Sequence, residues 1–426
     1  MRTNELLDCI ENGGLDLVLT RIYGKENLDS QKERYIEAVK DFEAIYGKRE
    51  VSLFSVPGRS ELSGNHTDHN HGKVLAGSIN LDIIAVSAKT DDGIIRIKSK
   101  GFDEDVVDTN TYTKPKESDF FKSNALIAGM AKAFKNDGYA SGGYVAYTTS
   151  NVFKGSGLSS SAAFEVMVGN ILNYFYNDGK VENVEIAKMA QYSENEFFGK
   201  PCGLMDQMAC AVGGFVYIDF EDTKNPVIEK IPFDLSGQGY ALCIVNTGGN
   251  HADLNEDYAS VPSEMKSVAK FFGKEYLRQL TKEEVLASVE LLRTACGDRA
   301  ILRAIHFFNE NERVTSQADS LRQGDIRGFF KLVKKSGRSS FMYLQNVFTT
   351  KNVREQGLSL ALAITDSVLS GTDSAFRVHG GGFAGTIQAF VPFNLVEQYR
   401  EAIDSAFGIG ACHVLRIRPD GAIKVI

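Results

Sequence analysis

The sequence lacks most features that mark membrane proteins, disulfide-rich proteins and nucleic-acid binders. Its 426 residues include only six cysteines, and no CxxC pair occurs among them. Acidic residues outnumber basic ones by 55 to 47, which gives a net charge of −8. No apolar run reaches the roughly 18 residues that a membrane helix needs. We therefore expect no membrane span, no disulfide framework or zinc site, and no nucleic acid bound by a basic face.

The composition is that of a folded, soluble protein. Hydrophobic residues make up 43% of the chain and charged residues 24%. The length predicts two or three domains. Residues 1–10 carry charges among their apolar positions and lack the apolar core of a signal peptide, so we expect a cytoplasmic protein with its cysteines reduced.

Helices and strands alternate irregularly along the chain, which predicts an α+β fold rather than a doubly wound sheet. Helical spacing covers residues 1–47, and a strand is expected at 51–56, ending at Pro57-Gly58. Residues 256–370 are strongly helical in pattern. Composition places a boundary near 220–238, so we expect two domains, 1–222 and 223–426. Further strands are expected at 83–88, 94–98, 143–149, 215–219, 240–245, 386–391 and 413–416, and further helices at 121–135, 162–176, 182–198 and 394–406.

Residues 57–72 concentrate polar side chains directly after the first predicted strand. So many of them cannot all belong to a core, and a solvated loop is one interpretation. A metal site is a second, but the three histidines lack the fixed helical spacing of a zinc motif. A polyol-binding loop fits better, because Asn65, His66 and Asp68 offer donors and acceptors in fixed directions.

Residues 155–163 form a glycine- and serine-rich loop that opens a predicted helix. Glycines let a backbone approach a ligand closely, and a helix start supplies unpaired N–H groups and a positive dipole. The segment therefore predicts a cradle for phosphates, against the alternative of an ordinary turn with a serine cap. It lacks the GxxxxGK[ST] pattern of a Walker loop.

Two acidic residues and a glycine cluster complete the candidates. Asp206 follows the turn-rich run 199–205 and is either a helix cap or a catalytic carboxylate. Glu194, on the preceding predicted helix, is either an exposed helical residue or a metal ligand. Residues 380–385 match GxGxxG, but a strand follows them instead of a helix, which excludes a dinucleotide fingerprint. A glycine-rich turn beneath a phosphate loop is the better interpretation.

These segments, in this order, resemble the GHMP kinases, and among them the galactokinases. The galactokinase signature G-R-x-x-L-x-G-E-H-x-D-Y-N-x-G-x-V-L is followed by residues 58–75, GRSELSGNHTDHNHGKVL, with two departures. The second family motif, P-x-G-x-G-L-S-S-S-A, is matched from 155 to 162, with Phe153 in place of its proline. The run PCGLMDQ at 201–207 and the third glycine motif at 380–385 complete the resemblance.

The resemblance implies a fold, two cofactors and a reaction. The expected fold has an N-terminal domain like ribosomal protein S5 domain 2 and a C-terminal α+β domain, with the site between them. The expected reaction transfers a phosphoryl group from ATP, with Mg²⁺, to the anomeric hydroxyl of a sugar. Asp206 would take or orient the sugar proton, and Arg59 would keep that carboxylate ionised. Ser161 and Glu194 match the Mg²⁺ ligands. The ATP phosphates would be wrapped by Gly155, Ser156, Gly157, Leu158, Ser159 and Ser160.

The sugar-contacting positions of the family fall on Asn65, His66, Asp68, Gly203 and Tyr258, the last assigned by its spacing after His251. Two positions depart from the signature. Asn65 replaces a glutamate that contacts the sugar O6, and His69 replaces a tyrosine. An amide carries no charge and can donate to a carboxylate, and plant galacturonate kinases also lose this glutamate. The two hypotheses are therefore a galactose kinase with tolerated drift and a kinase for galacturonate or another C6-altered galactose.

A third hypothesis is a regulator of the same fold that binds sugar and ATP without turnover. The presence of Arg59, Asp206, Ser161 and Glu194 argues against it. We expect a small sugar and ATP as the partners, with no nucleic acid and no membrane. We also expect a monomer or weak homo-oligomer.

Overall fold

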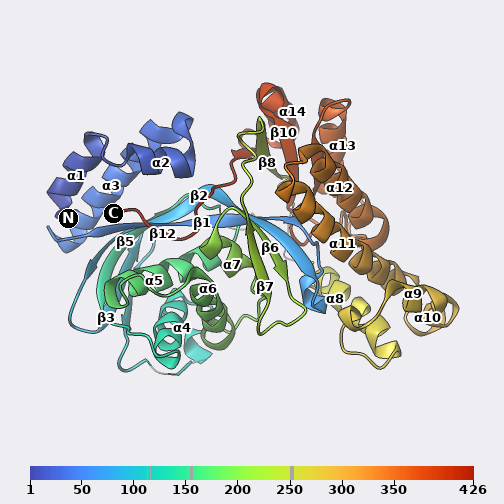
Figure 1. The fold of residues 1–426 in the computed structure, drawn as a ribbon, viewed down its shortest axis with the longest axis horizontal. Coiled ribbons are helices and arrows are strands. Elements are labelled where there is room, and N and C mark those ends of the chain that lie inside the picture. Colours follow the sequence, from blue (N-terminus) through green and yellow to red (C-terminus); the bar gives the residue numbers. More distant parts are fainter. Residues whose placement is uncertain (113, 116, 154–156, 250–253) are drawn as a thin grey trace. The chain divides into compact units, whose positions relative to one another are not determined.

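The computed structural model describes residues 1–426 except 113, 116, 154–156 and 250–253 (Figure 1). The chain forms two compact units that interleave along the sequence. Unit 1 contains Met1–Arg59, Ser78–Gly214 and Arg418–Ile426, and unit 2 contains Ser60–Gly77 and Phe215–Ile417. Strands β1 and β2 each pass from one unit into the other. The two consecutive domains predicted from the sequence stay a prediction.

Unit 1 is built on a mainly antiparallel sheet with the order β12-β1-β2-β5-β3-β4. β3 and β5 are parallel neighbours, with Ile95 opposite Tyr144, whereas β2 with β5 and β3 with β4 are antiparallel. This mixture confirms the predicted α+β class. The strands are β1 (Ser52–Ser63), β2 (Lys73–Lys89), β3 (Ile94–Ser99), β4 (Glu104–Asp108), β5 (Tyr144–Ser150) and β12 (Ile423–Lys424).

Helices cover both faces of the unit 1 sheet (Figure 1). One face carries α1 (Thr3–Glu11), α2 (Asp16–Tyr23) and α3 (Leu28–Tyr46). The buried residues Tyr35 and Phe42 of α3 share a core with Ile84 and Val86 of β2. The opposite face carries α4 (Ser123–Asn136), α5 (Ser160–Tyr176), α6 (Asn183–Tyr192) and α7 (Met205–Val212).

A buried carboxylate joins the first helices to the sheet. Asp82 of β2 is fully buried and accepts hydrogen bonds from Tyr23 Oη at 2.5 Å and from Arg34 Nη1 at 2.6 Å. Arg418 Nη1 lies 3.1 Å from the same carboxylate. The two guanidinium groups offset the cost of burying Asp82 and hold its pKa below the ordinary value despite that burial.

The first strand is longer than the sequence predicts. We expected it to end at Pro57-Gly58, whereas β1 continues to Ser63. Proline is tolerated because it lacks only the N–H donor, and β12 pairs with β1 at Phe54 and Ser55, before the proline. The polar residues that follow are therefore strand residues with buried side chains, and the solvated-loop interpretation is wrong for them.

Unit 2 contains a second antiparallel sheet with the order β11-β8-β10-β9. In its register, Ala389 of β10 lies between Cys243 of β8 and Phe376 of β9. The hairpin of β6 and β7 belongs to the first, eight-stranded sheet, because β6 pairs with the first residues of β2. The strands are β6 (Phe215–Asp219), β7 (Val227–Ile231), β8 (Tyr240–Asn246), β9 (Ala375–Val378), β10 (Thr386–Pro392) and β11 (Cys412–Leu415).

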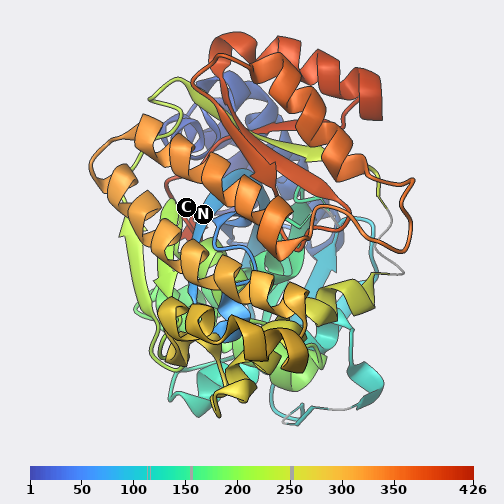
Figure 2. The same cartoon turned by 90° about the vertical axis from the view of Figure 1, so that its right-hand side faces the viewer.

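The helices of unit 2 pack on this sheet and on one another. Tyr399 and Ile403 share a core with the strand residues Ile387 and Ala389. Phe329 packs edge-on against Phe390, and α11 lies alongside α12 (Figure 2). The helices are α8 (Asn255–Phe271), α9 (Lys282–Ala287), α10 (Val289–Ala295), α11 (Asp298–Arg322), α12 (Ile326–Ser339), α13 (Gly357–Leu369) and α14 (Val396–Phe407). Across the described residues, no helix has both the length and the apolar character that a bilayer crossing requires.

Candidate active site

The glycine- and serine-rich loop of unit 1 presents an open helix start. Helix α5 begins at Ser160, and no side chain caps it. Ser159, in the left-handed region at φ 58°, directs its hydroxyl to Asp206 Oδ2 at 2.5 Å. The alternative of a simple serine cap is therefore wrong, and the first N–H groups of α5 keep their capacity for an anion. Gly155 and Ser156 lie outside the described residues.

Strand β1 holds this loop by its backbone. The N–H of Arg59 donates to the carbonyl of Leu158 at 3.1 Å, and the Arg59 guanidinium also donates to the carbonyl of Gly157. A Cβ at Gly58 would lie 2.7 Å from the Leu158 carbonyl oxygen, so only glycine fits there. The candidate phosphate loop, residues 155–160, is thus attached through Gly157 and Leu158 to the strand that carries Arg59.

Arg59 and Asp206 form a two-pronged ion pair within unit 1. Arg59 Nε lies 2.7 Å from Asp206 Oδ1, and Nη2 lies 2.7 Å from Oδ2. Burial alone would raise the pKa of Asp206, but the Arg59 charge and the hydrogen bonds from Arg59 and Ser159 hold it below its ordinary value. Asp206 is the second residue of α7, which follows Leu204, so it is not the helix cap. The arrangement keeps an ionised carboxylate beside the phosphate loop.

Glu194 lies in a π-helical turn, η4 (Ser193–Phe198), that directly follows α6 and forms the last part of the helix predicted over 182–198. Its side chain is 3% exposed, so the interpretation as an exposed helical glutamate is wrong. Its oxygens accept from Lys200 Nζ at 2.9 Å and from Gln207 Nε2 at 2.8 Å. Gln207 follows Asp206 in α7 and so links the two carboxylates. Ser161 is half-buried in the first turn of α5.

A cavity of about 820 Å³ lies in unit 1 beside the start of α5. The sequence did not identify it, because its walls come from segments far apart along the chain. It is lined by Ser160, Ser161 and Phe164 of α5, by residues 148–150 of β5 and by residues 102–105, among others. Phe121, Ser123 and Asn124 also line it, and they belong to the segment 120–124, whose aromatic and polar residues carry no specific signal in the sequence.

The candidate sugar loop, residues 64–72, lies in unit 2 between β1 and β2. Asn65 and His66 are 1% and 8% exposed, and Asp68 is partly exposed in a short turn, η2 (Asp68–Asn70). Burial, reinforced by neighbouring His69, lowers the pKa of His66 from 6.5 to about 4. Its ring is therefore neutral at pH 7, and Nε2 donates to the carbonyl of Gly381 at 2.9 Å. In the described chain no group of three or more His, Cys, Asp or Glu residues has metal-binding geometry.

The glycine run 380–385 lies against these sugar-loop residues within unit 2. Asn65 Nδ2 donates to the Gly380 carbonyl at 2.6 Å, and Tyr258 Oη of α8 donates to the Gly382 carbonyl at 2.9 Å. A Cβ at Gly381 would lie 2.6 Å from the Tyr258 ring. The structure thus joins three sequence candidates, Asn65, His66 and Tyr258, on one backbone segment. Gly203 belongs to unit 1, where it is exposed in the loop before α7.

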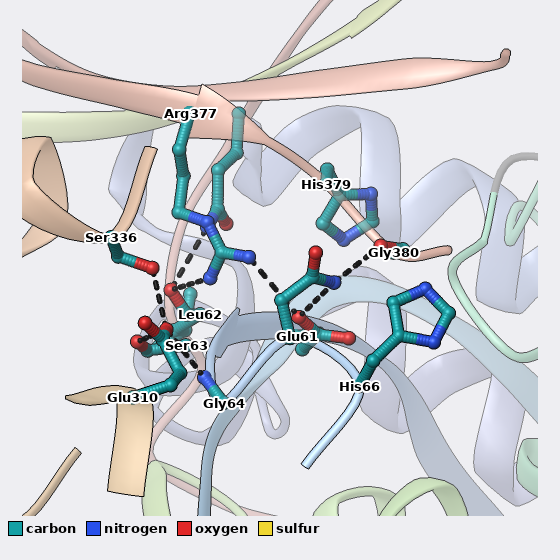
Figure 3. A network of polar contacts seen from close by, with 12 residues as sticks. Glu61, Leu62, Ser63, Gly64, His66, Glu310, Ser336, Arg377, His379 and Gly380 are labelled. Atoms are coloured by element: carbon teal, nitrogen blue, oxygen red, sulfur yellow. Dashed lines mark hydrogen bonds and ion pairs between the residues drawn. The ribbon is translucent and has the colours of Figure 1, made fainter. Parts of the chain in front are cut away.

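A buried polar network supports the sugar loop from behind (Figure 3). Glu310 of α11 is fully buried and accepts from Ser63 Oγ at 3.0 Å and Ser336 Oγ at 2.5 Å. His306, one turn earlier, donates through Nε2 to the Asn65 carbonyl at 3.0 Å. The sequence did not single out Glu310 or His306, because polar residues within a long helix carry no local sign of their partners.

The chain matches two protein-family models. Residues 40–89 match the galactokinase galactose-binding signature, and residues 125–214 match the GHMP kinase N-terminal domain. A galactokinase from Streptomyces coelicolor is 30% identical over 379 residues, which cover 88% of this chain and 94% of that protein. This chain belongs to the galactokinase family. A galactokinase from Actinobacillus pleuropneumoniae serotype 3 is 31% identical over 368 residues, 86% of this chain and 92% of the relative.

Solved structures agree on the fold. The Lactococcus lactis galactokinase complexed with galactose superposes with a TM-score of 0.74 at 24% identity, over 90% of this chain and 98% of that one. A mevalonate kinase superposes with a TM-score of 0.60 at 14% identity, over 86% and 98% of the two chains. The predicted GHMP kinase fold is confirmed, and the protein is a galactokinase-family sugar kinase.

Proposed function

We propose that this galactokinase-family member transfers the γ-phosphoryl group of ATP to the anomeric hydroxyl of galactose, giving galactose 1-phosphate and ADP. The observation that carries the proposal is the pair of 2.7 Å contacts between Arg59 and Asp206 beside the phosphate loop. An ionised carboxylate is needed to receive a hydroxyl proton, and a neighbouring guanidinium is suited to the charge that develops on a transferring phosphoryl group.

The nucleotide is assigned to unit 1. Backbone N–H groups of the loop Gly155–Ser160 would hold the phosphates, supported by the uncapped start of α5. The cavity of about 820 Å³ is large enough for a nucleoside and opens onto Ser160 and Ser161 of the same helix start. We therefore assign the adenine base to this cavity.

The donor set around Glu194 fits Mg²⁺, which prefers carboxylate and hydroxyl oxygens. Lys200 Nζ already places a cation 2.9 Å from Glu194 Oε1, so this carboxylate is arranged to face positive charge. Ser161 and Glu194 would hold the ion, and Gln207 would keep Glu194 oriented. When bound, Mg²⁺ neutralises phosphate charge.

The sugar is assigned to His66, Asp68, Gly203 and Tyr258. Neutral His66 donates through Nε2, which leaves Nδ1 as an acceptor for a hydroxyl. Both hydrogens of the Asn65 amide already bind protein oxygens, on Glu61 and Gly380. No Asn65 donor remains for a C6 carboxylate, so the geometry favours galactose over galacturonate.

The proposed step transfers the γ-phosphoryl group from ATP to the sugar O1. The sugar O1–H bond breaks and its proton moves to Asp206. The O1 lone pair forms a bond to the γ-phosphorus while the bond from that phosphorus to the bridging oxygen breaks, and ADP leaves with the electron pair. Arg59 keeps Asp206 ionised before the transfer. A cytoplasmic location and a monomeric or weakly associating state stay predictions from the sequence.

The test is ADP release measured by a coupled assay with galactose, galacturonate and 6-deoxygalactose. We expect turnover with galactose and at least 100-fold lower kcat/KM with galacturonate, because a desolvated carboxylate would lack a donor. Galacturonate turnover equal to that of galactose would contradict the substrate assignment. Tight binding of sugar and ATP with no ADP formed would favour a sensor over a kinase.

A further inference from the structure

The Asn65 amide uses both of its donors, and its oxygen, in hydrogen bonds to its own chain. Its Nδ2 donates to Glu61 Oε1 at 3.0 Å and to the Gly380 carbonyl at 2.6 Å. Its Oδ1 accepts from Asn346 Nδ2 at 2.7 Å. The side chain is 1% exposed. Because both donors are used and the side chain is buried, Asn65 supports the site and does not offer its NH₂ group to a ligand.

The orientation of this amide follows from its neighbours. Glu61 and the Gly380 carbonyl offer only acceptors, so the NH₂ group of Asn65 must face them and its oxygen must face Asn346. Asn346 must then present its own NH₂ group, which also reaches the Gly381 carbonyl at 3.1 Å. Asn346 is fully buried, between η6 (Ser340–Leu344) and α13. The hydrogen bonds therefore run in one direction, from Asn346 to Asn65 to Glu61.

Glu61 also carries the negative charge of this network. Arg377 of β9 is fully buried and lies 3.4 Å from Glu61 Oε1, while its Nη1 donates to the Leu62 carbonyl at 3.1 Å (Figure 3). A buried guanidinium needs a nearby carboxylate. Glu61 supplies this carboxylate to Arg377. A carboxylate in place of the Asn65 amide would face the Glu61 carboxylate and the Gly380 carbonyl oxygen, which are both acceptors.

We propose that Glu61, Asn65 and Asn346 form a relay that positions the sugar loop on the glycine run 380–382, and that Asn65 does not itself contact the C6 group of the sugar. The relay ends on the same run of carbonyls that binds His66 and Tyr258. It therefore sets where these two sugar-facing residues lie. The proposal rests on the proposed sugar kinase function and deepens it by naming Glu61 and Asn346 as positioning residues.

The first test compares two substrates in the variant Asn346→Ala. A positioning residue affects galactose and 6-deoxygalactose alike, so the ratio of their kcat/KM values should stay within threefold of the wild-type ratio while both fall about tenfold. The variant Asn65→Ala should show the same constant ratio. If Asn65 contacts the C6 hydroxyl, its loss would instead shrink the preference for galactose by tenfold or more, which would overturn the proposal.

The second test is a double-mutant cycle between Glu61→Gln and Asn65→Asp. The variant Asn65→Asp places two carboxylates together and should lower kcat/KM about 100-fold. Adding Glu61→Gln removes one of these charges, supplies an amide donor to the new aspartate and leaves Arg377 one carboxylate nearby. The double variant should therefore be about tenfold more active than Asn65→Asp. If the double variant instead loses kcat/KM by the product of the two single losses, the two residues act independently, which would contradict the relay.

The same cycle is measured by urea unfolding without substrate, so that the relay is tested even if the sugar kinase function fails. The unfolding midpoint should fall in Asn65→Asp and rise again when Glu61→Gln is added. Asn70→Asp is the matched control, because Asn70 is an equally buried amide of the same loop that instead contacts Met265 and Leu277. Its effect should not change with Glu61→Gln. Equal coupling at both positions would show a general loop effect and refute the relay.

Discussion

Replacement of Arg59 by alanine separates the electrostatic role of this residue from its structural one. In the native protein the guanidinium holds the Asp206 carboxylate ionised through two contacts of 2.7 Å. Without it, burial dominates, and the pKa of Asp206 rises. We therefore expect Arg59→Ala to lower kcat/KM and to move the acid limb of the pH profile to higher pH.

The size of the effect follows from the geometry. A hydrogen bond to a charged group contributes about 1.5–3 kcal/mol, and Arg59 makes two of them to Asp206. Because the Asp206 side chain is 34% exposed, solvent screens the pair. We therefore take roughly 2–3 kcal/mol for both bonds, which corresponds to a loss of about 30- to 150-fold in kcat/KM.

The assay is kcat/KM for galactose across pH 4–9, for the native protein, Arg59→Ala and Arg59→Lys. A depressed carboxylate pKa means that activity is retained as the pH falls until the carboxylate is protonated, so activity should fail at a higher pH in Arg59→Ala. Lysine restores the charge but not the planar fork, so Arg59→Lys should recover the native acid limb and only part of the rate.

An Arg59→Ala protein that keeps the native acid limb and a rate within threefold of the native value would exclude this electrostatic role of Arg59. An urea unfolding curve of the same variant serves as the control. Its midpoint reports, independently of the rate, how much stability is lost with all the guanidinium contacts, including the one to the Gly157 carbonyl.

Two further predictions concern stability. Asp82→Asn leaves Arg34 and Arg418 buried without their carboxylate, so urea unfolding should show a loss of about 3–5 kcal/mol, and a loss below 1 kcal/mol would contradict the assigned network. Burial lowers the pKa of His306 from 6.5 to about 3, so the unfolded chain binds a proton between these values that the folded chain does not. Stability should therefore decline as the pH falls below about 6.5, and His306→Gln should flatten that decline when thermal unfolding is followed from pH 7 to pH 5; an unchanged slope would exclude this histidine as the cause.

The sequence predicts the fold class, most of the elements and the unit 1 part of the site, because these depend on local patterns. Hydrophobic periodicity identifies β6 and α5, and the glycine–serine loop marks the start of α5. Asp206 lies in the short motif at 201–207, whereas Glu194 comes from the family resemblance, and the roles of both stay predictions. The end of β1 was predicted wrongly from local sequence. Pro57 ends a strand only where a neighbouring strand needs its missing N–H donor, and β1 continues to Ser63.

The unit 2 part of the site depends on residues that are distant along the chain. Asn346 and Arg377 lie about 280 and 310 residues after the loop that they support. No local pattern distinguishes a buried asparagine that orders another amide from one exposed in a turn. For the same reason the sequence does not show that the Asn65 amide donates to Glu61 and to the Gly380 carbonyl, and its role as a sugar contact stays a prediction from the resemblance.

The proposed function depends on Asp206 taking part in the transfer of phosphate from ATP to the sugar O1. Phosphorus NMR of a reaction containing ATP and galactose tests it directly, with calorimetric ATP binding measured in parallel. The native protein should give a phosphate resonance coupled to the anomeric proton, and Asp206→Asn should give none while binding ATP with a Kd within threefold of the native value. A phosphate at another sugar position, or product formed by Asp206→Asn at more than a tenth of the native rate, would contradict it.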